Sequence, residues 1–274
     1  MTSGFYDYIL RARTDGTIVV GFNTFGYEDA CEFVRAAETQ NRPILLMTNR
    51  DACRDMDVAH WGAMLRSIAE DAKVPVSAHL DHCSDLDLIF RAIDSGYTSV
   101  MYDGSKLPLE ENIANSKKVI AYAHKKGVFV ECELGNVPYS DCTDAPPVFT
   151  ELSDVEQFVQ EVDVDMLAIS VGNIHRQTSS ATHINFDLLQ QIEAITTVPL
   201  VVHGASGICQ EDKLALKQHS VSKINVGTTL RMIFGDALRC SMKVHPKEFD
   251  HLKLMVEARQ EVYEGARSII ELMQ

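Results

Sequence analysis

Short apolar runs alternate with amphipathic stretches along the whole chain. The runs recur about every 25 to 40 residues, which is the repeat of a strand followed by a helix. They are TIVVGFN, PILLMTN, VPVSAHLDH, SVMYDG, VFVECELG, MLAIS, PLVVHG and KINVG. Because they are apolar at nearly every position rather than at every second one, they predict strands covered on both faces, as in a parallel sheet.

The stretches between the runs predict helices. In one of them, apolar residues recur at helical spacing and share one face: Trp61, Met64, Leu65, Ile68 and Ala69. In another, Ser84 and Asp87 resemble an N-cap pair before an apolar stripe that Gly96 ends. Strands and helices that alternate in this way indicate an α/β protein.

Eight such strand–helix units predict closure into a single (β/α)8 TIM barrel. An N-terminal helix around Ser3 to Arg13 and C-terminal helices after Val244 would be additions to it. The open doubly wound alternative expects a glycine-rich turn after the first strand, and FNTFGYED lacks one. Since no Pro/Gly/Ser-rich linker interrupts the pattern, residues 1–274 are predicted to form one domain.

Polar residues stand at or just past the C-terminal ends of the predicted strands, on the face where barrel active sites are built. They are Asn23, Thr48, Asp81, His82, Asp103, Glu131, Glu133, His203 and Asn225. Any one of them could be a hydrogen-bonded core residue. Together they predict a functional site, because buried charges are costly unless they are paired or bound to a metal.

Three histidines, His82, His175 and His203, end the third, sixth and seventh strands. Imidazoles that converge from different strands are suited to bind zinc with one coordination position left for substrate. Asp103 and Glu133, which end the fourth and fifth strands, could orient these ligands or provide an alternative metal position. Asp81, directly before His82, is the candidate for proton transfer beside the metal.

Two turns rich in small residues follow the last two strands: HGASG and NVGTT. Such turns expose backbone N–H groups, and the loops after strands seven and eight commonly hold phosphate in this fold. Each could also be an ordinary turn. Together they predict a phosphorylated substrate that is bound by the small residues Gly204, Ser206, Gly207, Gly227 and Thr228, with Asn23 at the end of the first strand as a further candidate contact.

The composition and net charge argue against nucleic-acid and membrane partners. The net charge of −14 argues against a nucleic-acid surface, because few cations are available to displace phosphate counterions. No apolar run approaches the ~20 residues that span a bilayer, which excludes a membrane helix. The start of the chain lacks the layout of a signal peptide, and the seven cysteines are odd in number and contain no CxxC pair, which favours reduced thiols in the cytoplasm.

Several segments closely resemble class II, zinc-dependent ketose-bisphosphate aldolases, above all the tagatose- and fructose-bisphosphate aldolase branch. In the same order along nearly the whole chain, they are SAHLDH, SVMYDGS followed by LPLEENI, VECELG, VVHGASG and KINVGT. The resemblance implies reversible cleavage of a ketose 1,6-bisphosphate to dihydroxyacetone phosphate and an aldehyde. By position it implies zinc ligands at the three histidines, proton transfer at the C4 oxygen by Asp81, and an inner metal position at Asp103 and Glu133. It also implies that dihydroxyacetone phosphate contacts two segments: Gly204, Ala205 and Ser206, and Asn225, Val226, Gly227 and Thr228.

The chain departs from the family pattern at three places. After ELG, the family has a Gly-Gly pair and then an acidic cluster whose glutamate takes the C3 proton. Here the loop reads NVPYSDCTDAPP, in which Pro138 and Tyr139 replace the glycines and Asp141 is the candidate base. Arg176 follows the strand-six histidine in place of glycine, and either binds an acid or second phosphate or points to the surface. Cys83 replaces the glycine after LDH.

These departures predict an aldolase whose acceptor aldehyde differs from glyceraldehyde 3-phosphate. The alternative from another class is an inactive paralogue that acts as an accessory or regulatory subunit, although the retained Asp81 and histidines speak against it. A zinc hydrolase on the same barrel would be expected to carry an HxH pair on its first strand, which TIVVGFN lacks.

The apolar face of the predicted C-terminal helix indicates self-association. It includes Leu252, Val256, Val262 and Ile270 and is broader than a lone surface helix needs. We therefore expect a homodimer or homotetramer, and the sequence leaves open a supporting monovalent cation.

Overall fold

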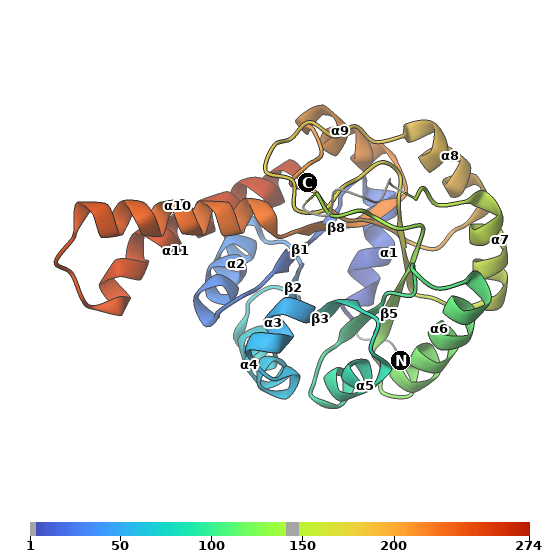
Figure 1. Ribbon diagram of the computed structural model, residues 1–274, viewed down its shortest axis with the longest axis horizontal. Helices are drawn as coiled ribbons and strands as arrows, with labels where there is room; N and C mark the ends of the chain where they lie inside the picture. The colour runs from blue at the N-terminus through green and yellow to red at the C-terminus, as the bar shows by residue number, and fades with distance from the viewer. Residues whose placement is uncertain (1–3, 141–147) are drawn as a thin grey trace.

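The computed structural model describes residues 4–140 and 148–274, and within them the strands close into a barrel. All neighbouring strands are parallel and pair in sequence order, with β8 returning to β1 (Figure 1). The strands are β1 Val19–Asn23, β2 Ile44–Asn49, β3 Val76–Cys83, β4 Ser99–Tyr102, β5 Phe129–Leu134, β6 Met166–Ile169, β7 Leu200–Val202 and β8 Val221–Val226. The predicted (β/α)8 barrel is confirmed.

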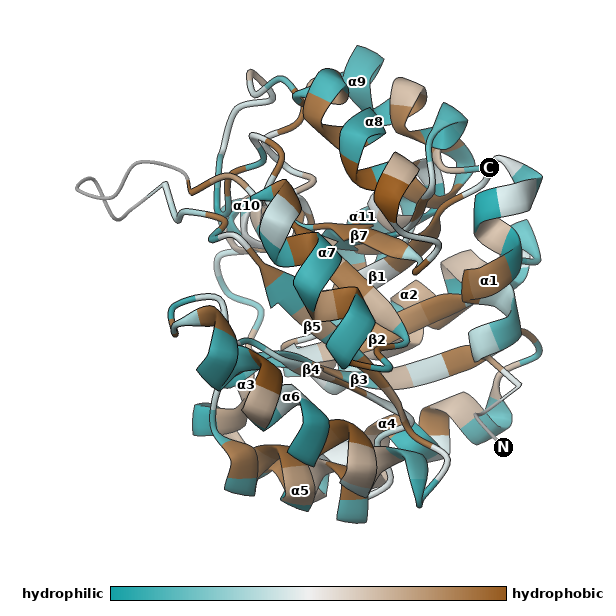
Figure 2. Ribbon diagram, turned by 90° about the vertical axis from the view of Figure 1, so that its right-hand side faces the viewer, coloured by the Kyte–Doolittle hydropathy of each residue, from teal (hydrophilic) through white to brown (hydrophobic). Residues whose placement is uncertain are grey.

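The helices form an outer layer around the strands. They are α1 Tyr6–Asp15, α2 Tyr27–Gln40, α3 Arg50–Asp55, α4 Val58–Asp71, α5 Leu86–Asp94, α6 Leu109–His124, α7 Leu152–Glu161, α8 Phe186–Ile195, α9 Gln210–Ala215, α10 Thr228–Val244 and α11 His251–Leu272, with a short 3-10 helix at Leu216–Gln218. The strands are largely hydrophobic, while the outward sides of the helices are hydrophilic (Figure 2). None of the described helices is long and apolar enough to cross a membrane.

The helix α1 closes the N-terminal end of the barrel. Phe5 and Ile9 pack in one buried cluster with the inward residues of the strands, and the Phe5 ring stacks on Phe129 with 6.1 Å between centroids. Burial of such side chains stabilises the fold by about 25 cal/mol for each Å² of apolar surface removed from water. With this end filled, the C-terminal ends of the strands are left for a pocket.

The start of α5 differs from the sequence prediction by one residue. The N-cap is Asp85, whose carboxylate accepts hydrogen bonds from the backbone N–H groups of Asp87 and Leu88 at 3.0 and 3.3 Å. A side chain can satisfy these first free N–H groups only from the position directly before the helix, so Ser84 lies too far back. Gly96 has φ of +100° and lies just beyond the end of the helix, as predicted.

The helices α10 and α11 form a hairpin that projects from the barrel, and α11 returns against α2 (Figure 1). Val262 and Ile270 pack inward, in line with the predicted apolar face. Leu252 and Val256 instead stay 71% and 61% exposed, and Phe249 at the tip is 93% exposed. The outer half of the hairpin therefore presents apolar side chains that this chain does not cover.

Candidate active site

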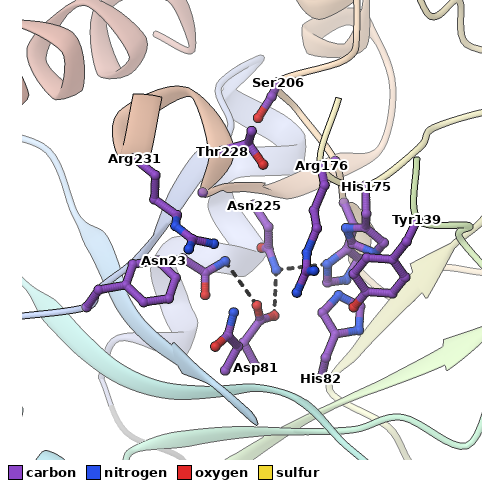
Figure 3. Close-up of a pocket in the computed structure, with 15 residues that line it drawn as sticks. Asn23, Asp81, His82, Tyr139, His175, Arg176, Ser206, Asn225, Thr228 and Arg231 are labelled. Carbon is purple, nitrogen blue, oxygen red and sulfur yellow. Dashed lines mark hydrogen bonds between the residues drawn. The ribbon is translucent and has the colours of Figure 1, made fainter. Parts of the chain in front are cut away.

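The main pocket opens at the C-terminal ends of the strands, where barrel active sites lie. Its lining comes from the ends of most strands and from the loops that follow them. The lining residues are Asn23, Phe25, Asn49, Asp81, His82, Tyr139, His175, Arg176, His203, Gly204, Ser206, Asn225, Gly227, Thr228 and Arg231 (Figure 3). Most of the residues predicted from the sequence are among them.

The three predicted histidines converge in this pocket. Their ring centroids lie 4.4 Å apart for His82 and His203, 4.7 Å for His82 and His175, and 5.7 Å for His175 and His203. One ring nitrogen from each lies within 4.8 Å of the others. The Nε2 atoms of His82 and His175 are buried without a hydrogen-bond partner among the described residues. Unpaired buried nitrogens of this kind fit a zinc ion as their missing partner.

His82 also belongs to a second metal-compatible group with the two predicted acids. Its Nδ1 lies 3.2 Å from Asp103 Oδ2 and 3.5 Å from Glu133 Oε2. The backbone of His82 has φ of +47°, a left-handed conformation that a residue with a Cβ seldom adopts. In this conformation the His82 ring belongs both to the histidine cluster and to the cluster with Asp103 and Glu133. The two acids can therefore orient His82 or accept a metal themselves.

Behind the histidines lies a buried ion pair that positions one of them. Glu131 Oε1 accepts from His203 Nε2 at 2.9 Å, and Glu131 Oε2 accepts from Lys223 Nζ at 2.7 Å. The side chains of all three residues are fully buried. Because Nε2 carries the proton given to Glu131, the Nδ1 atom of His203 keeps its lone pair, which accepts a hydrogen bond from Asn225 Nδ2 at 2.9 Å.

The pKa of His82 differs from those of His175 and His203, although all three rings are buried. Burial lowers the pKa of His82, but Asp81, Asp103 and Glu133 outweigh it and raise that pKa to about 10. Burial, followed by the charge of His82, lowers the pKa of His175 and of His203 well below the ordinary value. Burial raises the pKa of Glu133 to about 8, and the neighbouring Asp103 adds to the rise. This excess of carboxylates around His82 attracts a cation.

Two amide side chains hold Asp81. Asn23 Nδ2 donates to Asp81 Oδ2 at 3.1 Å, and Asn225 Nδ2 donates to Asp81 Oδ1 at 2.9 Å (Figure 3). The Asn225 amide also lies 2.9 Å from His203 Nδ1. Since each carboxylate oxygen accepts from a different strand end, the carboxylate is fixed beside the histidines, where it can exchange a proton with a bound molecule.

The two predicted turns lie together on the opposite wall of the pocket. Gly204 has φ of +71°, and a Cβ there would come within 2.4 Å of the Ile174 carbonyl oxygen, so only glycine fits this turn. The Ser206 hydroxyl accepts from the Thr229 N–H at 3.3 Å and joins the turns. Their small residues and the first turn of α10 form a suitable anion site.

Two residues of these turns do not line the pocket. Ala205 and Val226 were predicted to contact substrate, but their side chains are buried in the apolar core. The Ala205 N–H donates to the Asn225 carbonyl at 3.3 Å. Both residues therefore shape the turns from behind.

The loop after β5 is fastened to the loop after β6. The His175 N–H donates to the Pro138 carbonyl at 2.8 Å, and the Ser140 N–H donates to the His175 carbonyl at 3.0 Å. Between these bonds the Tyr139 ring stacks on the His175 ring with centroids 4.7 Å apart. Proline and tyrosine thus replace flexible glycines with a tethered aromatic wall. Asp141, the predicted base, lies outside the described residues.

Arg176 points into the pocket beside this wall (Figure 3). Its guanidinium lies 5.1 Å from the Tyr139 ring centroid and its Nη2 lies 2.8 Å from Asp51 Oδ2. Like His82, it has a left-handed backbone, with φ of +57°. The side chain therefore bridges α3 and the loops after β5 and β6 at the mouth of the pocket.

Several residues in the pocket or behind it were not predicted from the sequence. Arg231 lies one helical turn after Thr228 on α10, and its guanidinium lies 4.4 Å from the Phe25 ring. Asn49 ends β2 and was recognisable only as a polar residue at a strand end. Lys223 was overlooked because it stands in the middle of the last apolar run, two residues before Asn225. On a strand this spacing places both side chains inside the barrel.

Comparison with known proteins gives these features a context. The profile of the family described as fructose-bisphosphate aldolase class-II matches residues 5–274. The chain belongs to the class-II fructose-bisphosphate aldolase family. It is 30% identical to a fructose-bisphosphate aldolase of Staphylococcus aureus, over 97% of this chain and 94% of that protein. It is 33% identical to a probable fructose-bisphosphate aldolase of Bacillus subtilis, over 92% and 90% of the two chains.

Solved structures agree with the assignment. The YdjI aldolase of Escherichia coli K12 is 28% identical, with a TM-score of 0.86 over 100% of this chain and 97% of that one. The fructose-bisphosphate aldolase of Campylobacter jejuni, at 19% identity, shares the fold with a TM-score of 0.80 over 98% and 92%. The chain is therefore an aldolase, a carbon–carbon lyase of a family that is generally zinc-dependent.

The buried ion pair of this aldolase leads to a first prediction. Replacing Lys223 by methionine leaves Glu131 buried without its cation, so we expect unfolding free energy to fall by about 3–5 kcal/mol. A disturbed carboxylate behind His203 should also weaken zinc binding about 10- to 100-fold. Urea denaturation and competition with a chromophoric chelator measure the two effects. The matched control is Lys118→Met, which changes an exposed lysine. An equal zinc affinity in the two variants would contradict the prediction.

Proposed function

We propose that this aldolase catalyses zinc-dependent, reversible cleavage of a ketose 1,6-bisphosphate-like sugar into dihydroxyacetone phosphate and an aldehyde. The observation that carries the proposal is the arrangement of three histidines with unpaired or pocket-facing nitrogens beside a fixed carboxylate and opposite an anion site. The family supports aldol cleavage of a ketose bisphosphate. The metal and the products are our inference.

His82, His175 and His203 would hold the zinc ion. When bound, zinc supplies a Lewis acid that stabilises negative charge on the ketose oxygens. Asp103 and Glu133 lie against Nδ1 of His82 and would orient it, or accept the ion in an inner position. Glu131 would do the same for His203.

Asp81 would move the proton at the C4 oxygen. In the cleavage direction it removes that proton as the C3–C4 bond breaks and the aldehyde carbonyl forms, and in the aldol direction it returns the proton. The hydrogen bonds from Asn23 and Asn225 keep its two oxygens in place without satisfying their remaining lone pairs. The carboxylate therefore retains the capacity to accept.

The phosphate of the donor fragment would lie on the turns that contain Gly204, Ser206, Gly227 and Thr228. Backbone N–H groups and the N-terminus of α10 attract an anion even though the chain as a whole is acidic. This local grip fixes which end of the sugar faces Asp81.

The C3 proton requires a separate base. Burial and the nearby Asp81 raise the pKa of Tyr139 well above its ordinary value, so this phenol stays protonated and serves as a hydrogen-bond donor. We assign the base to Asp141, two positions after Tyr139 in the sequence.

We further propose that the acceptor is not glyceraldehyde 3-phosphate. Tyr139 and Arg176 narrow the aldehyde side of the pocket where the family has glycines, and Arg176 is placed to bind an acidic group of the acceptor. Slow turnover of fructose 1,6-bisphosphate is the expected result. A rate typical of a glycolytic enzyme would refute this part of the proposal.

Arg176→Ala tests the role of the guanidinium. In the aldol direction with dihydroxyacetone phosphate, we expect kcat/KM for acidic aldehydes to fall about 10- to 100-fold, in keeping with the about 1.5–3 kcal/mol of a charged hydrogen bond. The kcat/KM for neutral aldehydes should change only slightly. Arg91→Ala, on the exposed side of α5, is the matched control. An equal loss for acidic and neutral aldehydes would show that Arg176 only supports the loop.

The decisive experiment is proton–deuterium exchange at C3 of dihydroxyacetone phosphate in D2O, followed by NMR with zinc and after chelation. It tests the donor half of the reaction without an aldehyde. Zinc-dependent exchange is the expected result. No exchange on a protein with zinc demonstrably bound would overturn the proposal and favour an accessory subunit that has kept the barrel.

Self-association is proposed on the exposed apolar tip of the α10–α11 hairpin. Phe249, Leu252 and Val256 lie together on its outer half and are exposed, which is unfavourable for a monomer. We expect a homo-oligomer in light scattering and a shift toward monomer in Phe249→Ser. A wild-type chain that is monomeric at micromolar concentration would contradict this prediction.

A further inference from the structure

A second cluster of metal-binding side chains lies outside the aldolase pocket. It joins His183, in the loop between β6 and α8, with Cys209 and Asp212, at the start of α9. One ligand atom from each lies within 4.8 Å of the other two. None of these residues lines the catalytic pocket. We propose that they form a second site for a divalent transition metal, with zinc as the preferred ion.

The distances match a tetrahedral site. Cys209 Sγ lies 3.5 Å from His183 Nδ1, and Asp212 Oδ2 lies 3.3 Å from the same nitrogen. Metal–ligand lengths of about 2.3 Å for sulfur and about 2.0–2.1 Å for nitrogen and oxygen give edges of roughly 3.4–3.6 Å in a tetrahedron. The distances from His183 Nδ1 to the sulfur and to the oxygen therefore already match those that one ion would impose, and the sulfur and a carboxylate oxygen of Asp212 lie within 4.8 Å of each other.

The three side chains share their polar contacts. Cys209 Sγ and Asp212 Oδ2 both approach the same ring atom, Nδ1 of His183, which in a neutral imidazole has either one proton or one lone pair. The Cys209 thiol also hydrogen bonds with Asp212. A metal ion in place of the shared protons would contact nitrogen, oxygen and thiolate together.

The backbone holds the ligands in place without a metal. The Thr182 N–H donates to the Gly207 carbonyl at 2.8 Å, and the Cys209 N–H donates to the Thr182 carbonyl at 3.0 Å. The Ile184 N–H donates to Asp212 Oδ2 at 2.7 Å. These bonds flank His183 on both sides and fix it against α9, so little conformational entropy is lost when an ion binds.

The ligand types select the ion. A thiolate with an imidazole favours zinc and other soft or borderline ions over magnesium and calcium, which prefer oxygen ligands. Cys209 is buried, whereas the His183 side chain is 74% exposed, which leaves room for water as a fourth ligand. Three protein ligands and a water complete a four-coordinate site.

The site would join two loops of the catalytic pocket. The loop that carries His183 also carries His175 and Arg176, and the turn before Cys209 contains Gly204 and Ser206. A metal that links them would hold the strand-six loop against the phosphate turn. The role is structural, because no ligand of this site reaches the pocket.

Cobalt titration of the metal-free protein tests the proposal. A thiolate–cobalt bond gives an intense near-ultraviolet charge-transfer band, and the groups around His82 contain no thiol. We expect wild type to bind two equivalents of cobalt and to show this band. Cys209→Ser and His183→Gln should each lose one equivalent and the band, while they keep the visible spectrum of the catalytic ion and its aldolase activity.

His183→Gln keeps the test informative if the buried cysteine variant folds poorly, because the His183 side chain is exposed. Zinc content by mass spectrometry of the purified wild-type protein provides an independent measurement. One equivalent of metal in wild type without the charge-transfer band, or a band that persists in both variants, would overturn the proposal. A failure of aldolase activity with two metals bound would count against the proposed function alone.

Discussion

Replacing Asp81 by asparagine is expected to lower kcat for cleavage by about 10²–10⁴-fold, the usual contribution of a positioned general acid–base. An amide cannot accept the C4 proton, and its NH2 group would also face the amide donors of Asn23 or Asn225. Initial rates on the ketose phosphate identified by an acceptor screen measure the effect. Asp87→Asn, an exposed change six positions further along the chain, is the matched control.

The Asp81→Asn variant also separates proton exchange at C3 from cleavage of the C3–C4 bond. Because Asp81 is assigned to the C4 oxygen and not to C3, Asp81→Asn should retain zinc and most of the C3 proton–deuterium exchange of dihydroxyacetone phosphate. Loss of exchange together with cleavage, with zinc still bound, would show that Asp81 acts at C3 and that the assignment of Asp141 is wrong.

Chelation should abolish activity. Removal of the ion leaves the three histidines without the Lewis acid that stabilises the cleavage product, so we expect turnover to fall to background and to return on addition of zinc. Stability should fall as well, because zinc at 100 times its Kd adds about 2.7 kcal/mol to the folded state. Thermal unfolding with and without zinc measures this term. Full activity at a zinc content below one-hundredth of an equivalent would refute metal dependence.

Zinc affinity should decrease as the pH is lowered. The pKa of His82 is raised to about 10, with burial opposing and Asp81, Asp103 and Glu133 causing the rise, and the pKa of Glu133 is raised to about 8, chiefly by burial. At neutral pH both groups therefore carry protons that compete with the ion. Binding releases these protons, so the apparent affinity rises with pH through this range. Calorimetry in buffers of different ionisation enthalpy counts them, and zero release would contradict the prediction.

How far the sequence predicted the site depended on the kind of residue. His82, His175 and His203 were recognisable because polar residues at the ends of apolar runs are unusual, and the parallel barrel brings all strand ends to one face. Asp103 and Glu133 followed for the same reason. Lys223 was not recognised, because a lysine inside an apolar run identifies no partner until the barrel closes and brings it to Glu131.

Loop residues were harder to predict. The sequence showed that Pro138, Tyr139 and Arg176 replace glycines, but not that Tyr139 stacks on His175 or that Arg176 pairs with Asp51 of α3, 125 residues away. Such contacts depend on how two loops and a helix meet in space. The second cluster around His183 was missed for the same reason, since its ligands come from two loops whose spacing in the chain matches no motif.

The sequence by itself determined the (β/α)8 order, the face of the barrel that carries chemistry and the family. These properties follow from local periodicity and from residue types at strand ends, which act over a few neighbouring positions. The tertiary structure alone decided which nitrogen of each histidine faces the pocket, which cation balances Glu131, and which side chains wall the aldehyde side. Those outcomes depend on distances of about 3 Å between residues far apart in the chain, and only closure of the barrel and packing of its loops set them.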